Sequence, residues 1–241
     1  LFDVRDAAAE ELPLAQPPPS DERRRLKEEK TALGFYLSGH PFNAYRDEIR
    51  RFIKGSLATV AASAGGWESA QATQLLAGVI ESLRSQNSQS GRMMIVNLSD
   101  GEAKLEVTVY SDVLDRCRRL LAEDALIVVE ARVRTFRRNG DDGDAATVRV
   151  IAEQVFDLDA IRNRFARLIR IRCNGGSSVH KLRELLSPYR PGPCAVAIEY
   201  TNGAASCELR LPEEWRVNAA DNLVQSLAEW VSRPNVEIVY G

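Results

Sequence analysis

The sequence predicts a multidomain protein, mostly β and α+β, in which a short helical segment precedes a five-stranded barrel and a second α+β domain. Three observations lead to this prediction. Between residues 71 and 156, apolar and polar residues alternate with the two-residue period of β-strands, interrupted by one helical stretch. After residue 156, strand-like and helical stretches follow in the order β-α-β-β-α-β. The 241 residues are enough for both domains.

Four regions are therefore expected along the chain. Residues 1–19 are predicted to be a linker or tail, and residues 20–70 a helical segment that leads into the barrel. Residues 71–156 are predicted to form the barrel, and residues 157–241 the α+β domain.

Composition and charge indicate a globular protein whose surface is not strongly basic. Apolar residues make up 44% of the chain and charged residues 27%, which is ordinary for globular domains. With 32 basic and 34 acidic residues the net charge is −2, so any contact with nucleic acid has to come from a local basic patch. No apolar run approaches the roughly 18 residues of a membrane span, and we expect a cytoplasmic protein with no membrane partner.

Cysteine and histidine usage argues against a structural metal site or a disulfide framework. The cysteines, Cys117, Cys173, Cys194 and Cys207, are far apart in the sequence and form no CxxC pair. Reduced thiols in a cytosolic protein fit this pattern best. The acidic stretch at 141–144 resembles a fragment of a calcium loop, but it lacks the glutamate and the spacing of one, and a hairpin turn is favoured. We expect no metal and no cofactor in this chain.

The first region is predicted to be extended. It mixes Ala, Glu and Asp and ends in three consecutive prolines, which favour a stiff linker. No basic start followed by an apolar stretch marks a signal peptide. The sequence lacks an initiator Met, so we expect it to be a piece of a longer protein, whereas the last predicted strand lies close to residue 241, as at a natural C-terminus.

Two short helices are expected next. Gly39 is predicted to end the first helix, and Pro41 to prevent its continuation. Asn43 is expected to cap a second helix, which runs to Ile53. Residues 56–70 are loosely patterned and are expected to connect to the barrel.

The barrel prediction rests on the order of its elements. Three strands precede one helix and two strands follow it, and Gly78 in the long first strand indicates a bend or a close approach. This is the order of the OB-fold, a five-stranded Greek-key barrel with its helix between strands three and four. The predicted strands are residues 73–85, 92–100, 103–110, 125–136 and 145–158, with a polar loop at 85–91 and the helix at 111–124.

The second domain follows a predicted bridging helix. Its order, β-α-β-β-α-β, is that of a ferredoxin-like, split βαβ domain, with a hairpin turn at Asn202 and Gly203. The predicted strands are residues 167–173, 193–201, 206–212 and 235–241, the helices are 178–189 and 219–231, and the bridge is 158–167.

A basic patch on the barrel is the main candidate for function. OB-folds bind nucleic acid strands across the face of strands two and three, between the loops that join strands one to two and four to five. Cations near phosphates give affinity without sequence preference. The candidate nucleic-acid-binding residues are Arg84, Arg92, Lys104, Tyr110, Arg134, Phe136, Arg137 and Arg138.

An ordinary solvated surface is the competing interpretation of this patch. Residues 71–155 hold 11 basic and 13 acidic residues, so the region is slightly acidic as a whole. Stacking aromatics are sparse, because Tyr110 and Phe136 are the obvious ones, and strong single-strand binders carry more. We therefore expect weak, salt-sensitive binding of single-stranded DNA.

Two stretches give the chain a family resemblance. The stretch TALGFYLSGHPFNAY (31–45) and the later stretch NLSDGEAKLEVTVYSDVLD (97–115) resemble the C-terminal region of the bacterial DNA polymerase III alpha subunit, a C-family replicative polymerase. The run at 33–41 is the most specific part of this resemblance. It extends over nearly the whole chain, from about residue 27 to residue 241.

The resemblance implies two partners for the two folded domains. The OB domain of that family contacts single-stranded template DNA, and the last domain binds the tau subunit of the clamp loader. By resemblance, the tau-facing residues are Trp215, Arg216, Val236, Ile238 and Tyr240. The other interpretation of Trp215 is that it packs in the domain's own core.

The resemblance also implies what this piece lacks. The aspartates that hold Mg²⁺ for nucleotidyl transfer lie upstream in that family, so the parent is a DNA-directed DNA polymerase acting in chromosome replication, whereas this fragment has no catalytic residues. Leu1 and Phe2 match the last two residues of a clamp-binding peptide, so a sliding-clamp site is truncated here.

Other functional classes remain open from the sequence. The barrel is also compatible with a protein–protein interaction module that binds no DNA, an alternative that the acidic balance keeps open. A single sequence also does not exclude the same region of an error-prone C-family polymerase. An anticodon-binding domain of a tRNA synthetase fits the barrel, but not the domain that follows it.

The spacing of Ser38 and His40 raises the question of a catalytic dyad. Such a dyad needs an orienting acid and an oxyanion site, and the sequence offers no third member in an obvious place. We predict that His40 is a hydrogen-bonding residue at the corner between two helices.

Overall fold

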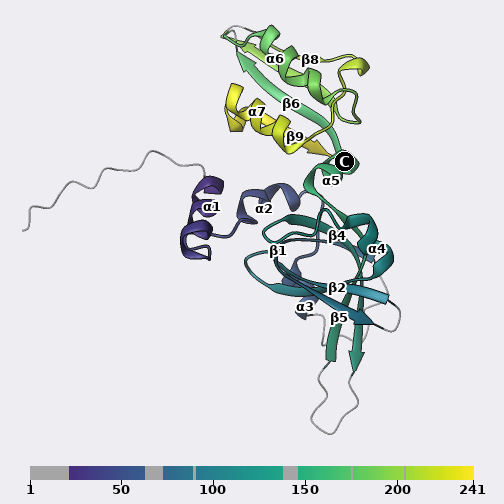
Figure 1. Cartoon of the computed structure of the whole chain (residues 1–241). Helices are drawn as coiled ribbons and strands as arrows, with labels where there is room; N and C mark the ends of the chain where they lie inside the picture. The colour runs from purple at the N-terminus through teal and green to yellow at the C-terminus, as the bar shows by residue number, and fades with distance from the viewer. Residues whose placement is uncertain (1–21, 63–72, 89–90, 138–145, 175, 204) are drawn as a thin grey trace, which may run out of the picture. The chain divides into compact units, whose positions relative to one another are not determined.

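A computed structural model describes residues 22–62, 73–88, 91–137, 146–174, 176–203 and 205–241 (Figure 1). The chain divides into two compact units, Leu1–Gly39 and His40–Gly241. The first unit contains helix α1 (Glu22–Leu33), and the second contains all the other described elements. The linker predicted at residues 1–19 lies outside the described residues.

Helix α1 ends earlier than the sequence predicted. It stops at Leu33 and not at Gly39, because Gly34 adopts a positive φ of 80° and its N–H donates to the carbonyl of Lys30 at 3.0 Å. Glycine is the residue that takes this left-handed helix-ending conformation without strain. Beyond the helix, the Glu29 carboxylate accepts the backbone N–H groups of Leu37 and Ser38, each at 2.9 Å.

The second unit starts with two short helices, α2 (Asn43–Ile49) and α3 (Leu57–Ala62). The prediction that Asn43 caps α2 is wrong, since Phe42 is the cap residue and Asn43 instead accepts a hydrogen bond from Arg46. The helix also ends at Ile49, before the predicted Ile53. The predicted role of His40 is confirmed, because its Nδ1 accepts the Phe42 N–H at 3.3 Å.

The predicted five-stranded barrel is confirmed. Its strands close in the order β1-β2-β3-β5-β4, with β3 and β5 parallel and the other neighbours antiparallel (Figure 1). Helix α4 lies between β3 and β4 in the sequence, as in an OB-fold. The elements are β1 (Thr73–Ser88), β2 (Gly91–Ser99), β3 (Lys104–Val109), α4 (Ser111–Cys117), β4 (Leu126–Arg137) and β5 (Ala146–Phe156).

Two details of the first hairpin follow from backbone pairing. The loop predicted at 85–91 is mostly strand, because Ser85 pairs with Met94 and the ladder continues to Ser88 and Gly91. The close approach predicted at Gly78 is confirmed, since a Cβ there would lie 3.0 Å from the Ser99 carbonyl oxygen.

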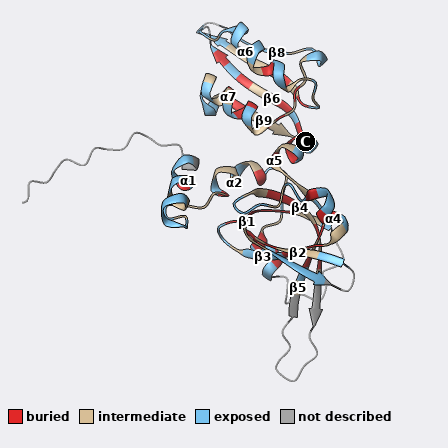
Figure 2. Ribbon diagram, viewed as in Figure 1, coloured by how far each residue is buried: buried red, intermediate tan, exposed pale blue. Residues whose placement is uncertain are grey.

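The barrel core is built from the inward side of each strand. Buried residues run along the barrel strands (Figure 2). Among them, Val96, Val107 and Val150 are fully buried, and burial of a side chain of this size is worth about 1.5–3 kcal/mol. Helix α4 adds its own buried residues, including Leu114, to the same cluster. The interior of the barrel is therefore filled by apolar side chains.

The second domain has the predicted element order but a different sheet. Its strands lie in the order β8-β7-β6-β9, with β6 and β7 paired directly in parallel and β8 and β9 antiparallel at the edges. The elements are α5 (Leu158–Phe165), β6 (Ala166–Asn174), α6 (Val179–Leu186), β7 (Ala195–Asn202), β8 (Ala205–Arg210), α7 (Asp221–Val231) and β9 (Val236–Tyr240).

The α+β character predicted for this domain is confirmed, but the split arrangement of a ferredoxin-like sheet is wrong. In a split βαβ unit another strand separates the two parallel strands, whereas here β6 and β7 are neighbours. Burial explains the difference. Val196 and Ala197 of β7 are buried, while every residue of β8 is exposed, so the apolar strand occupies the centre and the polar strand the edge.

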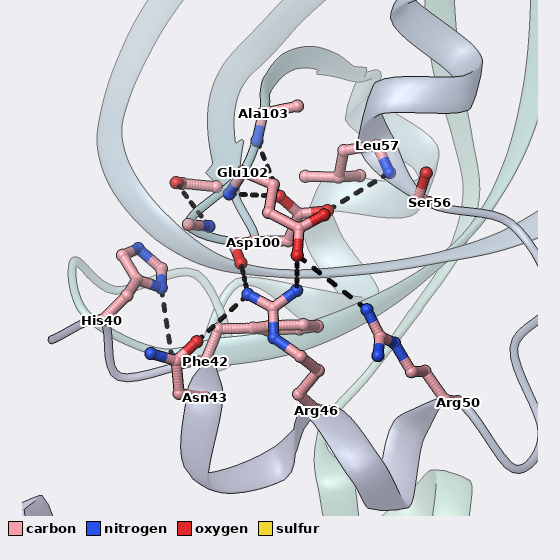
Figure 3. A network of polar contacts seen from close by, with 12 residues as sticks. His40, Phe42, Asn43, Arg46, Arg50, Ser56, Leu57, Asp100, Glu102 and Ala103 are labelled. Atoms are coloured by element: carbon pink, nitrogen blue, oxygen red, sulfur yellow. Dashed lines mark hydrogen bonds and ion pairs between the residues drawn. The ribbon is translucent and has the colours of Figure 1, made fainter.

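A network around Asp100 fixes the corner that contains His40 to the barrel (Figure 3). Asp100 is buried, and its carboxylate accepts the N–H groups of Glu102 and Ala103 at 3.0 and 2.8 Å. Arg46 of α2 donates to the Asp100 carbonyl at 2.7 Å and pairs with the Glu102 carboxylate. The corner is therefore held by the loop between β2 and β3.

A second network joins α2, α5, α7 and β9 around a buried guanidinium. Arg162 of α5 has a fully buried side chain and donates to both Glu48 oxygens at 2.6 and 2.8 Å, and to Asp221 at 2.9 Å. The Tyr240 hydroxyl also bonds to Glu48. Burial alone would raise the pKa of Glu48, but the Arg162 guanidinium and the Tyr240 hydroxyl outweigh it and hold this pKa below its usual range.

Replacing Arg162 with methionine should lower the free energy of unfolding by about 3–5 kcal/mol, because Glu48 and Asp221 would lose their shared cation. Urea denaturation measures this change. The control is Arg164→Met, since Arg164 is 46% exposed in its pair with Glu130 and should cost less than about 1 kcal/mol. Equal losses in the two variants would contradict the importance of the buried network.

The contribution of Glu48 should depend on pH. Because its pKa is lower in the folded state than in the unfolded chain, where it is about 4.3, its stabilising effect is complete above that pH and is lost as the pH falls through the folded-state value. The stability difference between the parent chain and Glu48→Gln should therefore be largest near neutral pH and shrink below about pH 4. Glu184→Gln, at a 56% exposed position, is the control and should show less than about 1 kcal/mol at any pH.

Candidate nucleic-acid interface

The outer face of β1, β2 and β3 presents one row of side chains from three strands. Arg84 pairs with Ile95, and Ile95 pairs with Thr108. Their neighbours Val96 and Val107 are fully buried in the barrel. Because side chains alternate along a strand, the row of Arg84, Ile95 and Thr108 points outward. This is the face on which OB-folds bind nucleic acid strands.

Two of the predicted binding cations on this face already have acidic partners. Arg84 is 68% exposed and its guanidinium lies 3.4 Å from the Glu106 carboxylate. Lys104 is 70% exposed and its Nζ lies 2.7 Å from Glu81. Such surface pairs contribute about 0–1 kcal/mol, so a phosphate is able to replace the carboxylates, but the pairs reduce the local positive charge.

Arg92 and Tyr110 lie near the same end of the β2–β3 ladder. Arg92 is exposed, donates to the Ser85 hydroxyl at 3.1 Å, and has no ion pair with any described carboxylate. Tyr110 directly follows Val109, which pairs with Met94 two residues from Arg92. Tyr110 is half-buried in an extended conformation at the start of α4. The two residues do not share a face, because Arg92 has the strand parity of the inward-facing Met94 and Val96, whereas Tyr110 has that of the outward-facing Thr108.

The β4–β5 hairpin carries the remaining predicted residues. Arg134 is half-buried and lies directly opposite Arg149 of β5. The side chains of Phe136 and Arg137, and the whole of Arg138, lie outside the described residues. Arg149 was missed by sequence reasoning, although the alternation around Val148 and Val150 is enough to place it on the outer face; its position opposite Arg134 depends on strand register.

The residues predicted to face tau separate into surface and core groups. Trp215 is half-buried, and the Arg190 guanidinium lies 4.0 Å from its ring centroid. Arg216 is partly exposed and donates to the Pro193 carbonyl. Val236 and Ile238 are 8% and 6% exposed, so their side chains pack inside the domain, and a partner at β9 would meet its backbone edge.

Three further predicted features have distinct outcomes. Tyr240, the last predicted tau-facing residue, uses its hydroxyl to bond Glu48. Leu1 and Phe2, the predicted clamp-binding remnant, lie outside the described residues. In the part of the chain that the structure describes, no group of three or more His, Cys, Asp or Glu residues is placed to hold a metal ion.

A polar cleft of about 480 Å³ opens beside α2 and β9. Its charged side chains are largely engaged with one another or with the backbone. Glu48 is held by Arg162, Arg172 lies 3.3 Å from Glu237, and Arg51 donates to the Ile238 carbonyl at 3.1 Å. Small-molecule sites are mostly apolar with a few convergent polar groups, and this cleft does not have that character.

No described helix is both long enough and apolar enough to cross a membrane.

Two family models match parts of the chain. Residues 75–158 match an OB-fold nucleic acid binding domain, and residues 181–231 match the C-terminal domain of DNA polymerase III subunit alpha. The first range corresponds to the barrel and the second to most of the α+β domain.

Relatives and solved structures extend the comparison. A DNA polymerase III subunit alpha from Pseudomonas aeruginosa is 33% identical over 90% of this chain and 18% of its own length. One from Neisseria meningitidis is 29% identical over 99% of this chain and 20% of its own length. A mitochondrial single-stranded DNA binding protein from S. cerevisiae has 17% identity and a TM-score of 0.32, covering 37% of this chain and 95% of that one.

The sequence resemblance is thus confirmed over nearly the whole chain. The chain spans about one fifth of the length of these polymerase relatives, and the family model that covers its second domain describes their C-terminal domain. The barrel observed here is of the type that the other model describes. The chain belongs to the family of the bacterial DNA polymerase III alpha subunit and matches its C-terminal region.

Proposed function

We propose that this chain is the non-catalytic C-terminal portion of a replicative DNA polymerase, in which the barrel contacts single-stranded template DNA weakly and without sequence preference. One observation carries this proposal: a closed OB barrel, matched by a nucleic acid binding model, exposes the cations Arg92 and Arg149 without a described acidic partner. Arg134 adds a third cation beside Arg149.

The physical basis is the release of counterions from the phosphate backbone. Each cation that approaches a phosphate displaces condensed ions, which gives affinity for any sequence. A polymerase that copies every template needs DNA binding that does not depend on sequence. The binding should be weak, because Arg84 and Lys104 are paired with carboxylates and Tyr110 is the one predicted stacking aromatic whose side chain is described.

We also propose that the second domain docks the tau subunit of the clamp loader. The match to the family's C-terminal domain covers residues 181–231 and includes Trp215 and Arg216. Trp and Arg are enriched where binding energy concentrates at interfaces, and the Arg190–Trp215 stack holds such a group at the surface.

The parent protein would supply the remaining activities. In this proposal it carries out Mg²⁺-dependent, DNA-templated DNA synthesis in the bacterial cytoplasm, with residues that are not part of this chain. Leu1 and Phe2 would end a sliding-clamp motif that begins before residue 1. The same region of an error-prone C-family polymerase is the alternative parent.

A second candidate function is a protein-interaction module whose barrel binds no DNA. The specific observation in its favour is the pairing of Arg84 and Lys104 with Glu106 and Glu81 on the face that would hold DNA. Direct measurement of DNA binding separates the two functions.

Labelled oligothymidine should bind the chain in fluorescence anisotropy at low salt, with a dissociation constant in the micromolar range or weaker. A mixed-sequence oligonucleotide should bind equally well. Arg92→Ala should reduce the slope of log K against log salt by about 0.7, the loss of one single-strand phosphate contact.

The control is Arg164→Ala, which removes a cation on α5 that is paired with Glu130 and should leave the slope unchanged. No anisotropy change at high micromolar protein and low salt would rule out the proposed DNA contact and favour the interaction module.

Trp215→Ala should weaken capture of the tau C-terminal domain at least tenfold in surface plasmon resonance, as expected for an anchor worth about 2 kcal/mol. Because Trp215 also packs against the domain core, the melting temperature of the Trp215→Ala variant has to be measured in parallel. Arg216→Ala, which removes a surface hydrogen bond, should weaken capture without unfolding. Arg183→Ala, at an exposed position of α6, is the control, and parent-like capture by both test variants would exclude this surface.

A further inference from the structure

Two arginines face each other across the β4–β5 hairpin. Arg134 of β4 and Arg149 of β5 are direct partners in the antiparallel register, in the same ladder that pairs Val133 with Val150. Directly opposite residues place their side chains on the same face of a sheet. Val133 and Val150 are buried in the barrel, so the two guanidinium groups share the outer face.

This arrangement is unfavourable in the chain alone. Like charges directly opposite each other destabilise a strand pair. In addition, the Nε atom of Arg134 is enclosed and has no hydrogen-bond partner among the described residues, although enclosed donors are almost always bonded. An anion bound between the two side chains would neutralise the repulsion.

The neighbouring charges do not supply that anion. Arg132, which precedes Arg134 by two residues in β4, forms an ion pair with the Glu153 carboxylate. On the adjacent strand β3, Glu106 pairs with Arg84. The described carboxylates around Arg134 and Arg149 are therefore engaged with other cations, and neither arginine has a described ion pair.

We propose that Arg134 and Arg149 form a phosphate-binding pair that holds one phosphodiester group of single-stranded DNA. This proposal rests on the proposed function and adds a defined contact to it. A guanidinium presents a planar fork of donors that matches phosphate oxygens. One phosphate between the two guanidinium groups would neutralise the repulsion.

The position of the pair fits a strand that crosses the outer face. β5 joins β3 at Val107↔Val150 and Thr108↔Ile151, so Arg149 lies one strand away from the row that contains Thr108. Single-stranded DNA is favoured over an acidic protein segment because the matched nucleic acid binding model spans residues 75–158 and includes both arginines.

The test uses single substitutions to threonine, which suits an exposed strand position. Arg149→Thr should raise the melting temperature at low salt, because it removes the repulsion, and should at the same time weaken binding of labelled oligothymidine. The plot of log K against log salt should become shallower, with the magnitude of its slope reduced by about 0.7. Inorganic phosphate should raise the melting temperature of the parent chain more than that of Arg149→Thr, and Arg134→Thr should behave in the same way.

Arg132→Thr is the matched control, two residues away on the same face of β4. Because Arg132 is already paired with Glu153, its replacement should lower the melting temperature and leave the salt slope unchanged. Arg134→Lys, which keeps the charge but loses the fork, should retain the slope and bind several-fold more weakly.

Several outcomes would overturn the proposal. A lower melting temperature for Arg149→Thr would mean that the chain itself satisfies the pair. An unchanged salt slope for Arg149→Thr, together with a reduced slope for Arg92→Ala, would show that the arginine pair does not bind a DNA phosphate. The proposed contact between the barrel and DNA would still stand. Arg149-dependent stabilisation by phosphate without any DNA binding would assign the pair to another anion, and would contradict the proposed function as well.

Discussion

The buried guanidinium of Arg162 is the interaction on which the arrangement of the second unit depends. A cation removed from water is stable only when it is neutralised and its donors are bonded. Arg162 meets this requirement with Glu48 from α2 and Asp221 from α7, while Tyr240 from β9 bonds to Glu48. One side chain therefore joins the corner before the barrel, the bridge after it and two elements of the second domain. Moving α2 or α7 away from α5 would leave a carboxylate without its cation, and moving β9 away would break the hydrogen bond from Tyr240 to Glu48.

This constraint has a consequence for function. The outer face of the barrel and the surface around Trp215 belong to the same compact unit, so the proposed DNA and tau contacts would be carried by one body. The Asp100 network adds a second fixed point, because Arg46 binds the loop between β2 and β3. The histidine of the family-specific run at 33–41, His40, thus lies in a structural corner and accepts a backbone hydrogen bond, which explains a sequence marker that resembles a catalytic pattern.

The barrel face combines satisfied and unsatisfied charges. Arg84 and Lys104 are neutralised by carboxylates, as expected for a stable surface, whereas Arg134 and Arg149 face each other without a described counter-charge. Local conflicts of this kind are expected at functional sites, where stability is given up for binding. The contrast with Arg132, which is paired on the same ladder, distinguishes the proposed contact from the charge found on any exposed strand.

The sequence by itself determined the element order, the OB barrel, the α+β character of the second domain and the family, because alternation and turn residues are local signals and the motif at 33–41 is specific. Only the tertiary structure decided that the first two helices end at Leu33 and Ile49 and that the second sheet has the order β8-β7-β6-β9. It alone also decided the position of Arg149 opposite Arg134 and the burial of Val236. The physical reason is distance along the chain. Arg162 and Glu48 are 114 residues apart, and neither their pairing nor strand register is encoded in any local pattern.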